Sequence, residues 1–341
     1  MQQTSLLAHR HADLITHLTY DFYGERLATC SADQKIKLFH RSSEGTWDLE
    51  TEWKAHDAPI IKLSFAHPSH GSLLASCSHD RTIRIWEEPS PSQVAQAKDG
   101  RWVERGVLTD AKGSVKAVEF GPSSPNYGLR LASIATDSYL RIHSSLDPSL
   151  NDWSLSHDIH IPSLLPSSPE ESQADGASTN ELAFGGWGLS WCKERWWGNI
   201  IAVFAGTSPV VKIIILDPTP TCVLRITPPS TSSLTSLSWA PSCGRSYHLL
   251  ATGARDGTVR IWRVDPPESD GEPNGRKDEW KCECVGEFGR GGARVGMVDW
   301  NLAGTMLTTS DDDGVIRIFK PTYAKTWKLL GKLTAEEPEE T

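Results

Sequence analysis

The hydrophobic and polar positions of this chain repeat a pattern of two short strands joined by a polar turn. The clearest copy runs from Leu74 to Trp86. The small and apolar residues from Ala75 to Ser78 suit a buried strand, and the alternation from Thr82 to Trp86, rich in β-branched and aromatic residues, predicts a second strand. Asp80 lies between the two, where aspartate favours a tight turn because its carboxylate bonds the backbone that follows. The pattern therefore predicts a β-hairpin.

The same hairpin recurs along the chain at intervals of 47 to 71 residues. The other copies run from Leu27 to Phe39, Leu131 to His143, Ile201 to Ile214, Leu250 to Trp262, and Leu307 to Phe319. Their expected blade-turn residues are Asp33, Asp137, Asp256 and Asp313, while the fourth copy has Ser208-Pro209 at this position. Repeats of this size with about four strands each are typical of WD40 β-propellers, in which neighbouring blades bury each other's faces.

Strand-like segments around each hairpin complete four strands per repeat. In the second copy we expect strands at 60–65, 73–78, 82–86 and 102–108, and in the less regular fourth copy at 187–191, 200–205, 210–216 and 222–226. The sequence thus predicts an all-β fold, a single WD40 propeller of six four-stranded blades within residues 1–334. The expected blades are approximately 11–55, 56–110, 111–161, 181–227, 231–288 and 293–333. Polar segments at 162–180 and 265–278 are expected to be mobile loops, and 335–341 an acidic tail.

The two ends of the repeat array indicate how the propeller closes. Only about ten residues precede the first expected strand, and the sixth copy already has its own fourth strand at 327–333. A propeller that is not closed leaves apolar sheet faces and strand edges exposed. Two alternatives follow: a tight six-bladed ring, or an open ring whose vacant position a partner chain fills.

Composition excludes several classes of protein. The net charge of −9 and the pI near 5.7 argue against a general nucleic-acid binder, which would carry a basic face. No apolar run is long enough for a signal peptide or a membrane span, so we expect no membrane insertion. The seven cysteines form no disulfide framework, and Cys282-Glu283-Cys284 lacks a metal-type spacing, which indicates a reducing compartment.

The second copy contains a set of polar residues with a defined order. His56, Ser76, Asp80 and Trp86 have the order and spacing of a structural hydrogen-bond chain, from carboxylate through imidazole and hydroxyl to indole. A catalytic Ser-His-Asp arrangement is the alternative, but nothing in the sequence supplies an oxyanion hole. We therefore expect a structural role and no catalytic residue.

Three other residue sets are open to a functional interpretation. A lysine or arginine follows each turn by four residues, and we expect its charge to meet a neighbouring acid rather than a phosphate. Five tryptophans begin the fourth strands, and these either form an interaction surface or cover their own blades. The twelve histidines lack partners at metal-ligand spacing, so no metal and no cofactor is expected. The five tryptophans are Trp47, Trp102, Trp153, Trp280 and Trp327.

Several segments resemble a known family. Residues 29–34 (TCSADQ), 65–68 (FAHP) and 73–82 (LLASCSHDRT) resemble the Sec-thirteen family of WD40 proteins. Residues 45–56, 244–248 and 323–330 resemble more closely the Sec-thirteen-homologue nucleoporins within it. The resemblance spans nearly the whole chain but is weak in the fourth copy, and the segments 162–180 and 265–278 depart from the animal members, as in a fungal-type protein.

This resemblance implies a function and a set of partners. It implies a non-enzymatic scaffold subunit of the Y-shaped nuclear pore subcomplex at the nuclear envelope, which supports nucleocytoplasmic transport. An α-solenoid nucleoporin would supply a seventh blade between the first and sixth copies, next to other Y-complex subunits. It also implies a second role in a SEA/GATOR-type coat at the vacuole or lysosome that regulates TOR signalling. The alternatives are a secretory-coat propeller of the same family and a WD40 module that reads peptides or histone tails.

Overall fold

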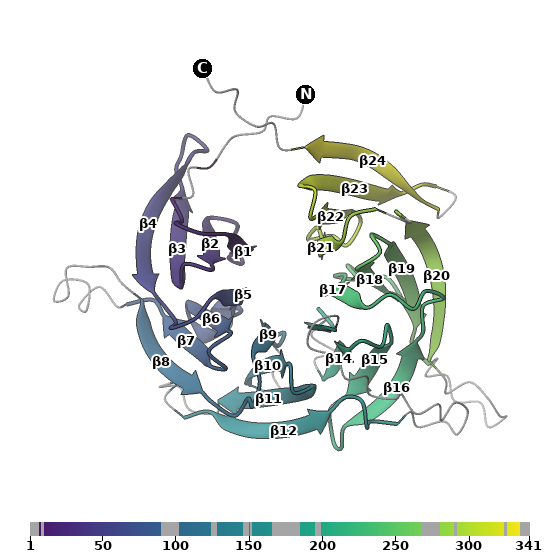
Figure 1. Ribbon diagram of the computed structural model, residues 1–341, viewed down its shortest axis with the longest axis horizontal. Coiled ribbons are helices and arrows are strands. Elements are labelled where there is room, and N and C mark those ends of the chain that lie inside the picture. Colours follow the sequence, from purple (N-terminus) through teal and green to yellow (C-terminus); the bar gives the residue numbers. More distant parts are fainter. Residues whose placement is uncertain are drawn as a thin grey trace. The chain divides into compact units, whose positions relative to one another are not determined.

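The computed structural model describes residues 7, 10–89, 102–123, 128–145, 150, 152–165, 185–194, 199–267, 280–289, 292–323 and 326–334. Within these ranges the chain forms strands β1 to β24 and one short 3-10 helix, Pro68–His70. The strands make six antiparallel sheets of four, and each sheet joins strands that are consecutive in the sequence (Figure 1). The described part of the chain contains no α-helix.

The chain divides into two compact units, residues 1–158 and 159–341. The first unit contains three sheets. Their strands are β1 (Ile15–Tyr20), β2 (Arg26–Ser31), β3 (Lys35–Arg41) and β4 (Trp47–Lys54); β5 (Ile60–Phe65), β6 (Leu73–Ser78), β7 (Ile83–Glu87) and β8 (Val103–Leu108); and β9 (Val115–Phe120), β10 (Leu129–Ala135), β11 (Tyr139–Ser145) and β12 (Ser154–His160), which contains the boundary between the units.

The second unit contains the other three sheets. Their strands are β13 (Gly186–Trp191), β14 (Ile200–Gly206), β15 (Val211–Ile215) and β16 (Thr221–Ile226); β17 (Leu234–Trp239), β18 (His248–Ala254), β19 (Val259–Asp265) and β20 (Lys281–Phe288); and β21 (Val295–Trp300), β22 (Leu307–Asp311), β23 (Val315–Pro321) and β24 (Trp327–Thr334).

Burial follows the position of a strand within its sheet. The second strands of four consecutive sheets, β6, β10, β14 and β18, are buried along their whole length. Within each unit, sheets that are neighbours in the sequence pack on one another, as β5 does on β9 and β17 on β21. A strand between two sheets has no solvent-facing side, which explains why these segments are small and apolar throughout rather than alternating. In the first unit, for example, Ile85 of one sheet and Val118 of the next belong to one apolar core.

The turn between the second and third strands has the same backbone form in five sheets. The residue after the turn aspartate has a positive φ, and it is Gln34, Arg81, Ser138, Gly257 or Gly314. A hydrogen bond closes each loop, such as that from the Gln34 N–H to the Ser31 carbonyl. This is the geometry of a type I turn followed by one left-handed residue, a common hairpin connection. The hairpin pattern in the sequence therefore corresponds to one repeated loop.

The predicted fold class is confirmed, with six four-stranded sheets in an all-β chain. The strand expected at 82–86 is Ile83–Glu87, and that expected at 210–216 is Val211–Ile215. The single domain over 1–334, the open ring and the gap between the first and sixth copies stay predictions. The segments 162–180, 265–278 and 335–341 lie wholly or mostly outside the described residues.

Candidate functional site

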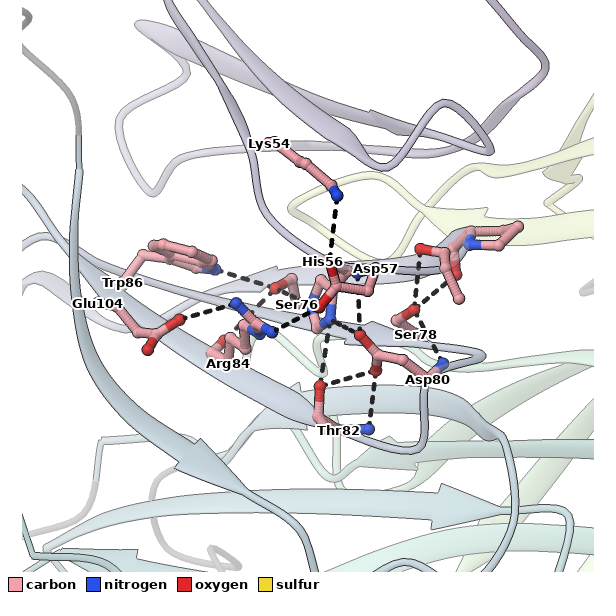
Figure 2. Close-up of polar contacts among 12 residues, drawn as sticks. Lys54, His56, Asp57, Ser76, Ser78, Asp80, Thr82, Arg84, Trp86 and Glu104 are labelled. Atoms are coloured by element: carbon pink, nitrogen blue, oxygen red, sulfur yellow. Dashed lines mark hydrogen bonds and ion pairs between the residues drawn. The ribbon is translucent and has the colours of Figure 1, made fainter.

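The structure brings together the four residues of the expected hydrogen-bond chain in the second sheet (Figure 2). The Trp86 indole N–H donates to the Ser76 hydroxyl at 2.9 Å, and this hydroxyl lies 2.8 Å from Nε2 of His56. Nδ1 of His56 lies 2.8 Å from the Asp80 carboxylate. His56, Ser76 and Trp86 are all buried, so these hydrogen bonds fasten the connection between β4 and β5 to strands β6 and β7.

The Asp80 carboxylate also organises the turn. One oxygen accepts the Thr82 backbone N–H at 2.9 Å and the Thr82 hydroxyl at 2.7 Å. Burial by itself would raise the pKa of Asp80, but the hydrogen bonds from His56 and Thr82 outweigh it and hold this pKa well below its usual range. The ionised carboxylate therefore holds Arg81, between Asp80 and Thr82, in its left-handed conformation with φ of 70°.

The first sheet carries the same chain without its indole. His11 lies 2.9 Å from Asp33 through Nδ1 and 2.9 Å from the Thr29 hydroxyl through Nε2. Phe39 replaces the tryptophan and is buried, but it has no N–H to donate. The hydrogen bonds of the histidine to the aspartate and to the hydroxyl are therefore kept, and apolar packing of Phe39 replaces the indole hydrogen bond.

In the third sheet an arginine takes the place of the histidine. The Arg141 guanidinium binds both oxygens of Asp137, at 3.2 and 2.7 Å. His143 stands at the tryptophan position and contacts Asp110 at 2.9 Å. The Asp137 carboxylate still accepts the Tyr139 backbone N–H at 3.1 Å, so the turn itself is unchanged.

In the fifth sheet the chain of hydrogen bonds is interrupted, and two separate contacts remain. The Trp262 indole N–H donates to the Thr252 hydroxyl at 3.0 Å, as in the second sheet. Asp256, however, accepts from the Ser230 hydroxyl at 3.1 Å rather than from a histidine. The turn and the indole contact are thus kept without the imidazole that would link them.

In the sixth sheet the carboxylate that accepts the turn hydrogen bond belongs to Asp311, two residues before the expected Asp313. Asp313 lies in the turn and is exposed, but the backbone N–H of Val315 donates to Asp311 at 2.9 Å. Asp311 is buried and also pairs with Arg317. The sequence pattern points to Asp313, because only its spacing matches the other copies. Arg317 gives no sign of the change, since every copy has a lysine or arginine at this position.

The basic residues that follow the turns bind acidic side chains in five sheets, as the sequence predicted. The pairs are Lys37 with Glu52 (2.8 Å), Arg84 with Glu104 (3.1 Å), Arg141 with Asp137 (2.7 Å), Arg260 with Glu287 (3.3 Å), and Arg317 with Asp311. In the fourth sheet Lys212 instead donates to the carbonyl oxygens of Ile161 (2.7 Å) and Leu164 (2.9 Å). Because these side chains are already bound to carboxylates or to backbone carbonyls, they do not form a phosphate site.

The tryptophans of the fourth strands pack on the sheets. Trp102 is buried and stacks on Trp53 with a centroid distance of 6.2 Å. Trp327 is buried and meets Trp300 edge to face at 5.4 Å. The other three are half-buried, and each packs on a neighbouring ring or apolar cluster. Of the two interpretations, the observed burial favours covering of the blades.

The geometry argues against a catalytic role for Ser76, His56 and Asp80. Ser76 has no exposed surface, and its hydroxyl already accepts the indole N–H, so a substrate has no access to it. Among the residues that the structure describes, no group of three His, Cys, Asp or Glu side chains is arranged to hold a metal ion. The same residues include no helix of the length and apolarity needed to cross a membrane.

Six four-stranded sheets with these turns define a WD40 β-propeller. A family model described as "WD domain, G-beta repeat" matches residues 2–40, 47–87 and 220–263. Nucleoporin SEH1 of Saccharomyces cerevisiae is 31% identical over 360 residues, covering 96% of this chain and 98% of the relative. Nucleoporin seh1 of Schizosaccharomyces pombe is 33% identical (97% and 96% covered), and Nucleoporin SEH1 of Homo sapiens 32% (96% and 87% covered).

The chain belongs to the nucleoporin SEH1 family. The resemblance found in the sequence is thereby confirmed. Membership of this family, together with the WD40 fold, makes the chain a structural protein rather than an enzyme.

Proposed function

We propose that this chain is a scaffold subunit of the nuclear pore complex, located at the nuclear envelope, where it supports nucleocytoplasmic transport. The observation that carries this proposal is similarity over nearly the full length of both chains to proteins named nucleoporin SEH1. The described residues agree with it, because their polar clusters stabilise turns and strands.

The partner that we propose is an α-solenoid nucleoporin of a Y-shaped subcomplex, whose strands add a seventh blade. Two separate observations support this. In the first unit, β1 has no buried residue, and Leu18 and Tyr20 are 45% and 53% exposed; its counterparts β5 and β9 each contain buried residues. An exposed apolar strand face of this kind favours association with another chain.

The second observation comes from the last sheet of the second unit. In β22, buried Leu307 and Thr309 alternate with exposed Thr308, whereas the equivalent strand β18 is buried throughout. Ile316 of the adjacent strand is 38% exposed. One face of this sheet therefore lacks the cover that a neighbouring blade gives elsewhere, and strands supplied by a partner would provide it.

Co-expression with candidate solenoid nucleoporins of the same organism tests the proposal. We expect one of them to co-purify in a stoichiometric complex, and Leu18→Arg and Ile316→Arg each to weaken it. Leu302→Arg is the matched control, since Leu302 is 90% exposed but lies in a turn outside both strands. Absence of any stoichiometric solenoid partner, or equal loss with Leu302→Arg, would contradict blade insertion.

A second assembly follows from the same family resemblance. We propose that the chain also enters a SEA/GATOR-type coat at the vacuolar or lysosomal surface and takes part in TOR signalling there. Affinity purification of the tagged chain, with mass spectrometry and microscopy, tests this separately. Recovery of nuclear pore subunits alone, with signal confined to the nuclear rim, would sink the second role and leave the first intact.

A further inference from the structure

A cavity of about 310 Å³ opens in the first unit, between the turn that joins β1 to β2 and the connection from β5 to β6. Its lining includes Asp21, Phe22, Tyr23, Glu25, Leu73 and Trp102. None of the cavity's lining residues belongs to the hydrogen-bond chain or to the strand faces proposed for the solenoid partner. Its volume is at the low end for ligand pockets, so it suits one side chain rather than a whole cofactor.

The floor of the cavity is apolar and fixed in place. The half-buried Phe65 and Pro68 line it, and the buried Leu73, Ala66 and Trp102 support them from behind. Trp102 stacks on Trp53, while Phe65 packs edge to face against it with a centroid distance of 6.3 Å. A ligand would therefore meet a preformed apolar surface and would not have to order it.

The rim of the cavity carries two aromatic rings that the fold does not cover. Phe22 and Tyr23 are 58% and 68% exposed, and their rings meet edge to face at 5.3 Å. Both stand on a tight turn that Asp21 holds by accepting the backbone N–H groups of Glu25 (2.9 Å) and Arg26 (3.1 Å). The Phe22 ring also meets the His67 ring edge to face at 4.8 Å, but both Phe22 and Tyr23 remain more than half exposed and form a ready surface for a cation.

The charge of the lining is negative. The guanidinium of Arg26 is already bound, with both oxygens of Glu88 at 2.8 and 2.7 Å and Glu50 at 3.1 Å. Glu25 is exposed, and its carboxylate has no ion-pair partner among the described residues. Asp21 adds a second carboxylate to the lining. A cationic ligand would find attraction here and no unpaired guanidinium to repel it.

We propose that this cavity binds the arginine side chain of a peptide segment from a partner protein. The planar guanidinium stacks on Phe22 or Tyr23 and pairs with Glu25, while the aliphatic stem lies on the half-buried Phe65 and Pro68, which line the cavity. Arginine fits better than lysine because a planar, weakly hydrated guanidinium both stacks on rings and binds a carboxylate through two N–H groups. This site is independent of the proposed blade insertion.

Ligand-observed NMR titration of the full chain tests the proposal, with the tripeptide acetyl-Gly-Arg-Gly-amide as the probe. The same peptide with citrulline in place of arginine has the same shape and no charge. We expect the arginine peptide to bind at least about fivefold more tightly than the citrulline peptide. We expect Phe22→Ala and Glu25→Gln each to lower its affinity by about the same factor.

Two substitutions serve as matched controls. Tyr323→Ala removes an aromatic ring that is fully exposed elsewhere, and Glu44→Gln neutralises an exposed carboxylate in another turn of the first sheet. Unchanged circular dichroism in all four variants confirms that they fold. Equal binding of the arginine and citrulline peptides, no binding at millimolar peptide, or equal losses in the control variants would each overturn the proposal.

Discussion

The indole nitrogen of Trp86 lies 2.9 Å from the hydroxyl of Ser76, and this contact sets the direction of the whole chain of hydrogen bonds. An indole only donates, and an ionised carboxylate only accepts. The Ser76 O–H is therefore free to donate to Nε2 of His56, and the Nδ1–H of His56 donates to Asp80. Ser76 is the link between the other two buried side chains, so removal of its hydroxyl leaves the Trp86 N–H and Nε2 of His56 buried without this partner.

Truncation of Trp86 should destabilise the protein severely. Trp86 is 2% exposed and packs against Trp53 with a centroid distance of 5.6 Å. We expect Trp86→Ala to lower the free energy of unfolding by about 3–5 kcal/mol, because it creates a cavity in the core. Trp86→Phe keeps most of the packing but removes the N–H, and we expect a loss of about 1–2 kcal/mol.

Urea denaturation followed by circular dichroism measures both losses. The control is Tyr323→Ala, at a fully exposed ring, which should change the free energy of unfolding by less than about 0.5 kcal/mol. An unchanged free energy of unfolding for Trp86→Ala would show that this indole is not part of a packed core.

Neutralisation of Asp80 should change how stability depends on pH. The pKa of Asp80 is lowered in the folded state: burial alone would raise it, but hydrogen bonds from His56 and Thr82 prevail. Its contribution to stability is therefore complete above the unfolded pKa near 4 and is lost as the pH falls through the folded pKa. Below pH 4 we expect the unfolding free energy to fall more steeply in the wild type than in Asp80→Asn.

The difference in slope should reach at most about 1.4 kcal/mol per pH unit for this one carboxylate. Acid denaturation curves at a series of pH values measure it. Asp48→Asn, at an exposed position of β4, is the control and should follow the wild-type curve. If Asp80→Asn and the wild type ran parallel from pH 4 downward, the carboxylate would not be stabilised by the fold.

The strands could be predicted from the sequence because a β-hairpin is specified by residues close together in the chain. Alternation, β-branched residues and an aspartate in the turn predicted both strands around Asp80 to within one residue. The shift from Asp313 to Asp311 was not predictable from spacing, since it depends on which carboxylate Arg317 reaches. The cavity beside Trp102 was missed for a related reason: its walls come from two sheets, and only their packing brings Phe22 and Leu73 together.

Replacement of His248 should weaken the dependence of stability on mildly acidic pH. Burial, and secondarily Arg245, lowers the pKa of His248 to about 4, against an opposing effect of Asp265. Because the unfolded histidine takes up a proton near pH 6.5 and the folded one does not, stability falls as the pH drops from about 6.5 to about 4. We expect His248→Phe to remove this part of the slope, at most about 1.4 kcal/mol per pH unit.

Phenylalanine keeps the aromatic contacts, since the His248 ring lies 5.3 Å from the ring of Trp239 and 6.3 Å from that of Trp280. The measurement is thermal or urea unfolding from pH 8 to pH 4. Above pH 7 the histidine is uncharged in both states, so the difference between the variants there reports packing alone and serves as the internal control. A slope equal to that of the wild type between pH 6 and pH 4.5 would contradict the role of His248.

The ammonium group of Lys212 organises the backbone where β12 ends. Lys212 is 5% exposed, and its Nζ donates to the carbonyl oxygens of Ile161, Pro162 and Leu164 at 2.7, 3.3 and 2.9 Å. Methionine has nearly the same length and no donor, so Lys212→Met leaves these carbonyls without their shared cation. We expect a loss of about 2–3 kcal/mol of stability.

The loss should be accompanied by a local change that distinguishes it from general destabilisation. Hydrogen–deuterium exchange should become faster in peptides covering 159–165 than in those covering β18, because Lys212 holds three backbone carbonyls of this segment in place. Lys328→Met, at an exposed position of β24, is the control and should leave both regions unchanged. If exchange at 159–165 kept its wild-type rate in Lys212→Met, the cation would not be what holds this segment against the fourth sheet.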